Sequence, residues 1–188
     1  VTFVLNSQNN NMIRYIIIII FLCINGALHS QAYRTRNISS TIHTIEVHLN
    51  GNANLNPVLT KGTNDFIRIG FDQISDYPNE RLRYRIFHCD ALWNKSNDIS
   101  EIDYLDGFND NFIEDYAPSI NTTVEYTHFN LEIPNRDVKV KYSGNYVVEV
   151  YSEKEPDAVL LTACFSVIEP LVSVGATVFS NTDIDTNK

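Results

Sequence analysis

The sequence predicts an all-β fold, an immunoglobulin-like β-sandwich of about seven strands in residues 38–169. Short runs of alternating apolar and polar residues recur through this region, with turn residues every ten to fifteen positions. No window after residue 40 holds a sustained helical period. Alternation with a period of two buries one face of a strand, and a series of such strands at this spacing is typical of a sandwich.

The predicted strands are rich in β-branched and aromatic residues, which favour extended backbone. In chain order, the alternating residues are Ile45, Val47 and Leu49; Ile67, Ile69 and Phe71; Leu82, Tyr84, Ile86 and His88; Thr127, Phe129, Leu131 and Ile133; Val138, Val140 and Tyr142; Tyr146, Val148 and Val150; and Leu161, Ala163, Phe165 and Val167. Turn sequences such as Asn50-Gly51-Asn52 and Pro134-Asn135 end these runs.

A corner is predicted at the start of the sixth run, where Ser143-Gly144-Asn145 precedes Tyr146. In sandwiches of this class, the hydroxyl of such a tyrosine bonds back to the backbone a few residues upstream. A simple hairpin turn at Ser143-Gly144 would produce a similar sequence, so both interpretations stay open.

The N-terminal residues are interpreted as export sequence. Arg14 follows Met12, the only methionine, and residues 15–24 form an unbroken apolar run that gives way to small and polar residues. Ten apolar residues are too few for a membrane span, which needs about 20, but they match a cleaved signal. We therefore expect an upstream translated segment at 1–11 and a signal peptide at 12–32, cleaved near Ser30 or Ala32; a membrane anchor is the alternative.

At the other end, the run after Pro170 alternates again, with Val172, Val174 and Val178 among its apolar residues. We expect residues 170–188 to be the start of a truncated second β domain.

Negative charge is concentrated in one stretch. Residues 96–135 contain nine acids and no Lys or Arg, while the other 14 acids (23 minus nine) balance the 14 bases, so the formal charge of −9 resides here. Nucleic-acid binding requires clustered Lys and Arg. This class of function is excluded on that ground.

The interval from Trp93 to Asn121 differs from the rest, being acidic, aromatic and without alternation. Its length is far above the usual four to six residues of a connection, and its apolar content argues against disorder. We expect an ordered loop, here termed the excursion, packed on one edge of the sandwich. Aromatic anchors within a polar rim favour a docking surface, for which the candidate partner-binding residues are Tyr104, Asp106, Phe108, Asn109, Asp110, Asp115 and Tyr116. Alternatively, the aromatics pack inward and the acids are a solvated face.

Three adjacent residues, His88-Cys89-Asp90, invite a catalytic interpretation. However, neighbours in a strand point to opposite faces, so His88 and Cys89 cannot act on each other. We interpret Cys89 as a small buried residue, Asp90 as a turn residue and Trp93 as a core aromatic. No catalytic residue is predicted, and a disulfide between Cys89 and Cys164 stays open.

Metal and cofactor sites are not predicted. The histidines His43, His48 and His128 are scattered in the sequence and there is no C-x-x-C pair for zinc. The excursion fails the EF-hand pattern around Gly107, because Ile102 and Tyr104 occupy positions that need acids. An irregular calcium site stays open.

Several short motifs together resemble the N-terminal domain of the type IX secretion plug proteins of Bacteroidota, over about residues 41–180. The matching elements are His88-Cys89-Asp90 with Trp93, the run from Tyr104 to Asn109, Asp115-Tyr116, Asn121-Thr122, Pro134-Asn135 and Ser143-Gly144-Asn145-Tyr146. Within them, the expected structural residues are His88, Cys89, Asp90, Trp93, Gly107, Gly144 and Tyr146.

The resemblance implies a non-enzymatic periplasmic protein that closes the periplasmic end of the outer-membrane translocon β-barrel. It would be peripheral to the membrane, held there through its protein partner. The alternative function is a secreted carbohydrate- or substrate-binding sandwich module, with Trp93 and the excursion tyrosines as stacking platforms.

Overall fold

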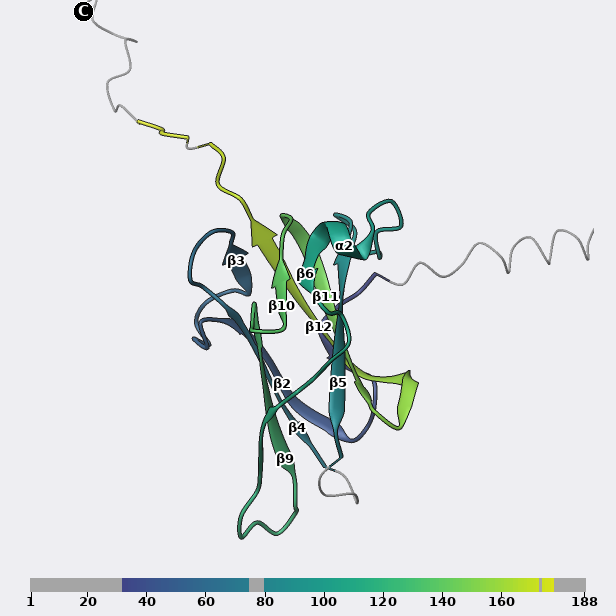
Figure 1. Ribbon diagram of the computed structural model, residues 1–188. Coiled ribbons are helices and arrows are strands. Elements are labelled where there is room, and N and C mark those ends of the chain that lie inside the picture. The colour runs from purple at the N-terminus through teal and green to yellow at the C-terminus, as the bar shows by residue number, and fades with distance from the viewer. Residues whose placement is uncertain (1–31, 75–79, 173, 178–188) are drawn as a thin grey trace, which may run out of the picture. The chain divides into compact units, whose positions relative to one another are not determined.

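The computed structural model describes residues 32–74, 80–172 and 174–177, which form a β-sandwich (Figure 1). The first sheet has the order β1 (Arg36–Asn37), β12 (Glu155–Ile168), β11 (Gly144–Ser152), β5 (Leu82–Cys89) and β7 (Asn111–Phe112), with β3 (Val58–Thr60) parallel to β12. The second sheet has the order β2 (Ile42–Leu49), β4 (Ile67–Gln73), β9 (Thr127–Ile133) and β8 (Asp115–Pro118). A small third sheet pairs β6 (Leu105–Gly107) with β10 (Val138–Val140), and α2 (Glu101–Tyr104) precedes β6. The predicted upstream segment and almost all of the predicted signal peptide lie outside the described residues.

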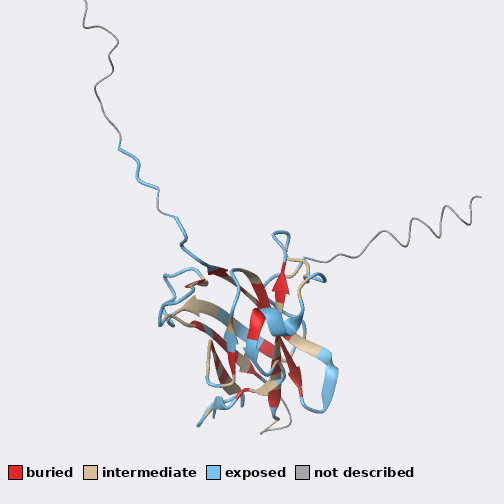
Figure 2. Ribbon diagram, turned by 45° about the horizontal axis from the view of Figure 1, so that its top comes forward, coloured by how far each residue is buried: buried red, intermediate tan, exposed pale blue. Residues whose placement is uncertain are grey.

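The core lies between the two main sheets and follows the predicted alternation. On β5, Leu82, Tyr84 and Ile86 are buried while the arginines between them are partly exposed. Across the second sheet, the rings of Phe71 and Phe129 stack with centroids 5.2 Å apart. Figure 2 shows buried residues along the central strands and exposed ones in the connections. The predicted all-β sandwich is therefore confirmed.

All seven predicted runs form strands, and the described residues contain five further strands (β1, β3, β6, β7 and β8). Each additional strand has two to four residues. Segments of two or three residues cannot show an alternating pattern, because period-two recognition needs at least four residues. β8 has four residues, but all of them are exposed and they do not alternate. Their pairing partners, rather than their own sequences, define them.

The excursion is ordered, as expected, and it contains the short strands β6, β7 and β8. After α2 and β6, the chain adds β7 to the exposed edge of β5 in the first sheet. It then crosses to the second sheet and adds β8 to the edge of β9. The excursion therefore closes one side of the sandwich by extending both sheets.

The run after Pro170 is in no strand within its described part, residues 170–172 and 174–177. Leu171, Val172 and Val174 are at least 80 % exposed. A strand needs a neighbour to satisfy its backbone hydrogen bonds, and none lies beside this run in the described part of the chain. The second domain stays a prediction. Among the described residues, no helix is long and apolar enough to cross a membrane.

Candidate functional site

His88 lies in a buried aromatic cluster. It is 9 % exposed, and its Nδ1 lies 2.8 Å from Ser96 Oγ. Its ring meets Tyr146 edge-on, with centroids 5.2 Å apart, and Tyr104 at 6.0 Å. The ring therefore packs against the aromatic rings of β11 and α2.

Tyr146 forms the predicted corner. Its hydroxyl donates to the Tyr142 carbonyl at 2.9 Å, four residues upstream. Its ring also stacks on Phe165 of β12, with centroids 5.4 Å apart. The corner is confirmed, and it ties the start of β11 to its preceding turn.

Two glycines permit close approaches beside this cluster. A Cβ on Gly144 would lie 2.4 Å from His88 Nε2, and one on Gly107 would lie 2.0 Å from the Asp137 carbonyl oxygen. Both glycines have positive φ, +142° and +113° respectively, which side chains disfavour. Gly107 thereby lets β6 pack on the chain that leads into β10.

Asp90 caps the turn after β5, as expected, but the expectation for Trp93 is wrong. Asp90 Oδ1 accepts hydrogen bonds from the backbone of Leu92 and Asn94 at 2.8 and 2.9 Å. Trp93 takes a positive φ of 65° in this turn, and its side chain is only half-buried and outside the core cluster.

Both described cysteines are free thiols. Cys89 is on β5 and Cys164 is on β12, with β11 between them. Strands two apart are separated by about 9–10 Å, beyond the Cα distance of a disulfide. Burial raises the pKa of Cys89 to about 12 and that of Cys164 to about 11, so both thiols stay protonated near neutral pH.

The structure divides the seven candidate partner-binding residues into two groups. Tyr104, Asn109 and Asp110 make internal contacts. Tyr104 is 5 % exposed and belongs to the core, where burial raises its pKa to about 12. Asp110 Oδ1 accepts from Arg83 Nε at 2.6 Å and from the Tyr151 hydroxyl.

Asn109 replaces a strand at the edge of β5, beyond the end of β7. Its Oδ1 accepts from the Ile86 N–H at 2.6 Å, and its Nδ2 donates to the Ile86 carbonyl at 2.8 Å. A second bond runs from Nδ2 to Glu101 Oε2 at 2.8 Å, which ties in α2. One side chain therefore anchors the excursion to the first sheet.

We expect Asn109→Ala to lower the free energy of unfolding by about 2–3 kcal/mol, because it leaves both backbone groups of Ile86 without this partner. Asn97→Ala, at an exposed position of the same segment, should change it by less than about 0.5 kcal/mol. Equilibrium denaturation of both variants measures this. Equal effects would show that the amide does not anchor the excursion.

The second group is exposed and is called here the excursion face: Asp106, Phe108, Asp115 and Tyr116. Phe108 is 81 % exposed at the end of β6, whereas Tyr116 is 48 % exposed and its ring lies 5.6 Å from that of Phe129. A shallow hollow of about 250 Å³ adjoins this face, with Asp115, Arg136 and Asp137 in its lining. The Phe108 N–H bonds to the Asp137 carbonyl at 3.2 Å, which connects the hollow to the end of β6.

Cations from neighbouring strands and from the β9–β10 connection compensate part of the acidic stretch. Arg83 pairs with Asp110, Arg68 with Glu132 at 2.6 Å, and Arg136 with Glu114 at 3.7 Å. Asp106 and Asp115 form no ion pair with any described residue. The two acids of the excursion face therefore lie outside these ion pairs, although Lys139 is opposite Asp106 across the β6–β10 ladder and Arg136 lines the hollow with Asp115.

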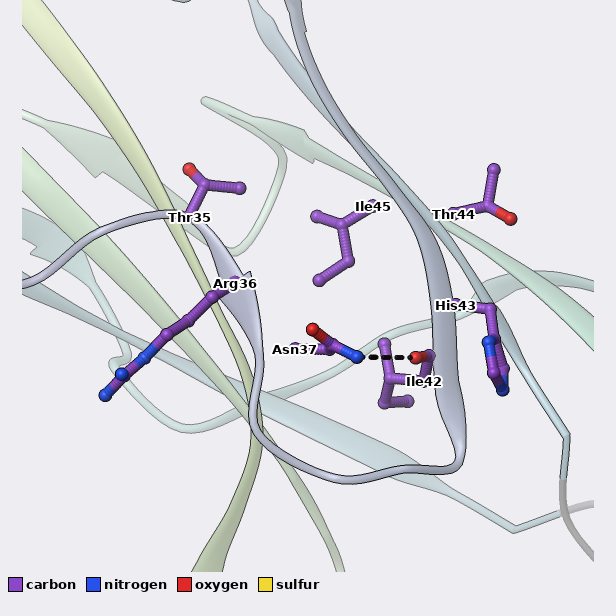
Figure 3. A pocket seen from close by; sticks show the side chains of 7 residues that line it. All are labelled: Thr35, Arg36, Asn37, Ile42, His43, Thr44 and Ile45. Atoms are coloured by element: carbon purple, nitrogen blue, oxygen red, sulfur yellow. Dashed lines mark hydrogen bonds between the residues drawn. The ribbon is translucent and has the colours of Figure 1, made fainter.

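A separate pocket of about 290 Å³ lies between the segment at 35–37 and β2. Figure 3 shows the side chains of Asn37, Ile42 and Ile45 between the segment at 35–37 and β2, whereas His43 lies on the outer side of β2. Asn37 Nδ2 already donates to the Ile42 carbonyl at 3.3 Å. Sequence reasoning missed this pocket, because β1 has only two residues.

The three histidines that are far apart in the sequence, His43, His48 and His128, all lie on the outer face of the second sheet. The β-ladders place His43 and His128 on either side of Asp72, and His128 Nδ1 lies 2.7 Å from Asp72 Oδ1. His48 is further along β2, opposite Arg68. Within the described ranges, no three His, Cys, Asp or Glu side chains are grouped to hold a metal ion.

Comparison with known proteins identifies the family. The family model described as the first domain of the type 9 secretion system plug protein matches residues 42–169. The chain belongs to this family. Membership implies an envelope-associated component of the type 9 secretion system, and the resemblance seen in the sequence is confirmed.

The plug-family domain is also similar to a solved hypothetical protein from Parabacteroides merdae ATCC 43184, at 41 % identity with a TM-score of 0.74. The match covers 85 % of this chain but only 40 % of that protein. A second structure, an alkylpurine DNA glycosylase from Pseudomonas fluorescens bound to DNA containing an abasic site analog, has 12 % identity and a TM-score of 0.33, over 68 % of this chain and 30 % of that one. The latter score is too low to indicate a shared fold. No curated protein matches the plug-family domain.

Proposed function

We propose that this chain is the first domain of a plug that closes the periplasmic end of the type IX outer-membrane translocon. The family match over residues 42–169 carries the proposal. In this role the protein acts by binding and not by catalysis, and it is held at the periplasmic face of the outer membrane by its contact with the translocon β-barrel.

The excursion face is the proposed contact surface. Phe108 offers a large apolar group at 81 % exposure, and Asp106 and Asp115 supply carboxylates that form no ion pair with any described residue. Exposed aromatics surrounded by polar groups are common hot spots of protein interfaces. The backbone beneath is well supported, because β6 pairs with β10 and β8 pairs with β9. Such a rigid surface limits the entropy lost on binding.

The alternative of a carbohydrate-binding module gains no specific support. Stacking on a sugar requires exposed aromatic faces arranged together. Trp93 is half-buried in the turn after β5, Tyr104 is in the core, and Tyr116 packs against Phe129. These three rings therefore do not offer a common exposed platform.

Copurification of the tagged protein with the translocon from its own host tests the proposal. We expect the wild-type protein to recover the β-barrel. Phe108→Ser should weaken this association by about 2 kcal/mol or more, roughly 30-fold, because a hot-spot anchor is lost.

Ile120→Ser is the matched control, because Ile120 is 80 % exposed but lies in the β8–β9 connection, away from the end of β6. It should leave recovery unchanged. Failure of the wild type to recover the barrel would overturn the plug function itself. Equal recovery by the wild type and Phe108→Ser would reject only the contact surface.

A further inference from the structure

We propose that two copies of this chain associate through the edge of β2, which pairs antiparallel with β2 of the second copy around a two-fold axis at Val47. The second sheets of the two copies then join into one continuous sheet. This inference is independent of the plug function, because β2 and β8 are opposite edges of the second sheet and the excursion face adjoins β8.

The backbone of β2 bonds to β4 through alternate residues. The Asn50 N–H donates to the Phe66 carbonyl at 2.8 Å, at the end of the β2–β4 ladder. In an antiparallel ladder the bonded residues recur at every second position, so the backbone groups of Glu46 and His48 also face β4. The residues between and beside them direct their backbone groups to the free edge: Ile45, Val47 and Leu49.

This free edge is covered only at its two ends. At the start of β2, the Ile42 carbonyl accepts from Asn37 Nδ2 at 3.3 Å. At the other end, the Leu49 carbonyl accepts from the Asn52 N–H at 3.0 Å. Within the described part of the chain, no hydrogen bond reaches the Leu49 N–H or either backbone group of Val47. Such unpaired groups are a template for another strand.

The core-facing side chains of β2 are also incompletely covered. All three pack against the core but are only half-buried: Ile45, Val47 and Leu49. On β4, which has a strand on each side, the core-facing side chains are 0 % exposed: Ile67, Ile69 and Phe71. A strand added beside β2 would remove the remaining apolar surface from water, which favours association.

The sequence of β2 is complementary to itself in one register, which identifies a second copy as the occupant of the edge. With Val47 on the axis, Val47 faces its own copy and Ile45 faces Leu49, so apolar residues meet on the core side. On the outer face, Glu46 of each copy lies opposite His48 of the other. An imidazole N–H donates to a carboxylate in either protonation state of the ring. Within one copy, Glu46 Oε2 already lies 3.6 Å from His48 Nε2, so the four groups form one cluster across the axis.

Other registers lack this complementarity. A shift by two residues puts Glu46 opposite its own copy in one direction and His48 opposite its own copy in the other, and like charges directly opposite each other are unfavourable. A shift by one residue would place core-facing side chains opposite outer ones, which the period of two in a sheet forbids. Residues 45–49 therefore define a single pairing.

Sedimentation velocity of the protein purified from its own host, at a series of concentrations, tests the association. We expect a monomer–dimer equilibrium with a Kd on the order of 10–100 µM, because one strand pair makes an interface at the small end of the range for proteins. A protein that stays monomeric at concentrations well above this Kd overturns the proposal, including the case in which the edge binds a strand of another protein instead.

Two variants test whether the dimer uses β2. Val47→Pro removes an N–H that points away from β4, and proline is tolerated at such edge positions. It should raise the Kd at least about 10-fold through loss of the paired bonds at the axis. His48→Glu leaves the backbone unchanged, and it places two carboxylates opposite each other twice in the symmetric dimer, so it should also raise the Kd about 10-fold.

The double variant Glu46→His/His48→Glu restores opposite partners and should return the Kd to within about threefold of wild type, a rescue that a merely structural effect would not give. Asn97→Glu adds one negative charge at an exposed position of the excursion and should leave the Kd unchanged. If His48→Glu dimerises as tightly as the wild type, or if the double variant stays as weak as His48→Glu, the pairing through β2 is wrong.

Discussion

Replacing Gly144 by alanine is expected to destabilise the domain by about 2–5 kcal/mol, because strain and overpacking act at the same residue. Its φ of +142° is a conformation that residues with a Cβ avoid, and the new Cβ would lie 2.4 Å from His88 Nε2. The His88 ring cannot move aside easily, since Tyr146 and Tyr104 flank it and Ser96 bonds to it. Equilibrium denaturation measures the change.

Gly62→Ala separates the two causes. Gly62 also has positive φ, +84°, but a Cβ there would meet nothing within 4 Å. It should cost only the backbone strain, about 1–2 kcal/mol. Adding His88→Ala to Gly144→Ala should remove the clash, so the double mutant should lose less stability than the two single losses combined. A loss for Gly144→Ala no larger than that for Gly62→Ala would contradict this account.

Tyr146→Ala should have the largest effect of a side-chain truncation, about 3–5 kcal/mol. The ring is fully buried and contacts His88, Tyr104 and Phe165, so its removal leaves a cavity where β5, β11 and β12 meet. Tyr146→Phe keeps the ring and loses only the bond to the Tyr142 carbonyl, which should cost about 1 kcal/mol.

Tyr142→Ala is the control for the corner, because the accepting carbonyl belongs to the backbone and the Tyr142 side chain is 45 % exposed. It should cost less than about 1 kcal/mol. Denaturation curves for the three variants should therefore rank Tyr146→Ala far above Tyr146→Phe and Tyr142→Ala. If Tyr146→Phe matched Tyr146→Ala, the hydroxyl and not the ring would dominate the corner.

The long strands could be predicted because their buried positions coincide with the apolar residues of an alternating pattern. Every second residue of β5 faces the core, so Leu82, Tyr84 and Ile86 are apolar and recognisable without any neighbour. The same geometry ruled out a nucleophile–base pair at His88 and Cys89. The structure agrees, with the histidine among aromatic rings and the thiol on the opposite face.

The excursion face could be predicted only in part, because composition does not tell which side of a non-repetitive segment is buried. Tyr104 and Phe108 are both aromatic and only four residues apart, yet one is 5 % and the other 81 % exposed. The difference arises because Tyr104 ends α2 against His88, whereas Phe108 follows Gly107 at the end of β6. Trp93 was misjudged for the same reason, since its positive φ depends on the turn that Asp90 caps.

The sequence by itself determined the sandwich, its main strands and the family, because each depends on residues that are close along the chain. Only the tertiary structure decided how the excursion joins both sheets, why Cys89 and Cys164 stay unpaired, and how Tyr33 and Arg34 attach to the first sheet. These features depend on strand order and on contacts such as Tyr33 with Glu149, 116 positions apart. Local sequence patterns do not indicate which segments, distant along the chain, become neighbours in the fold.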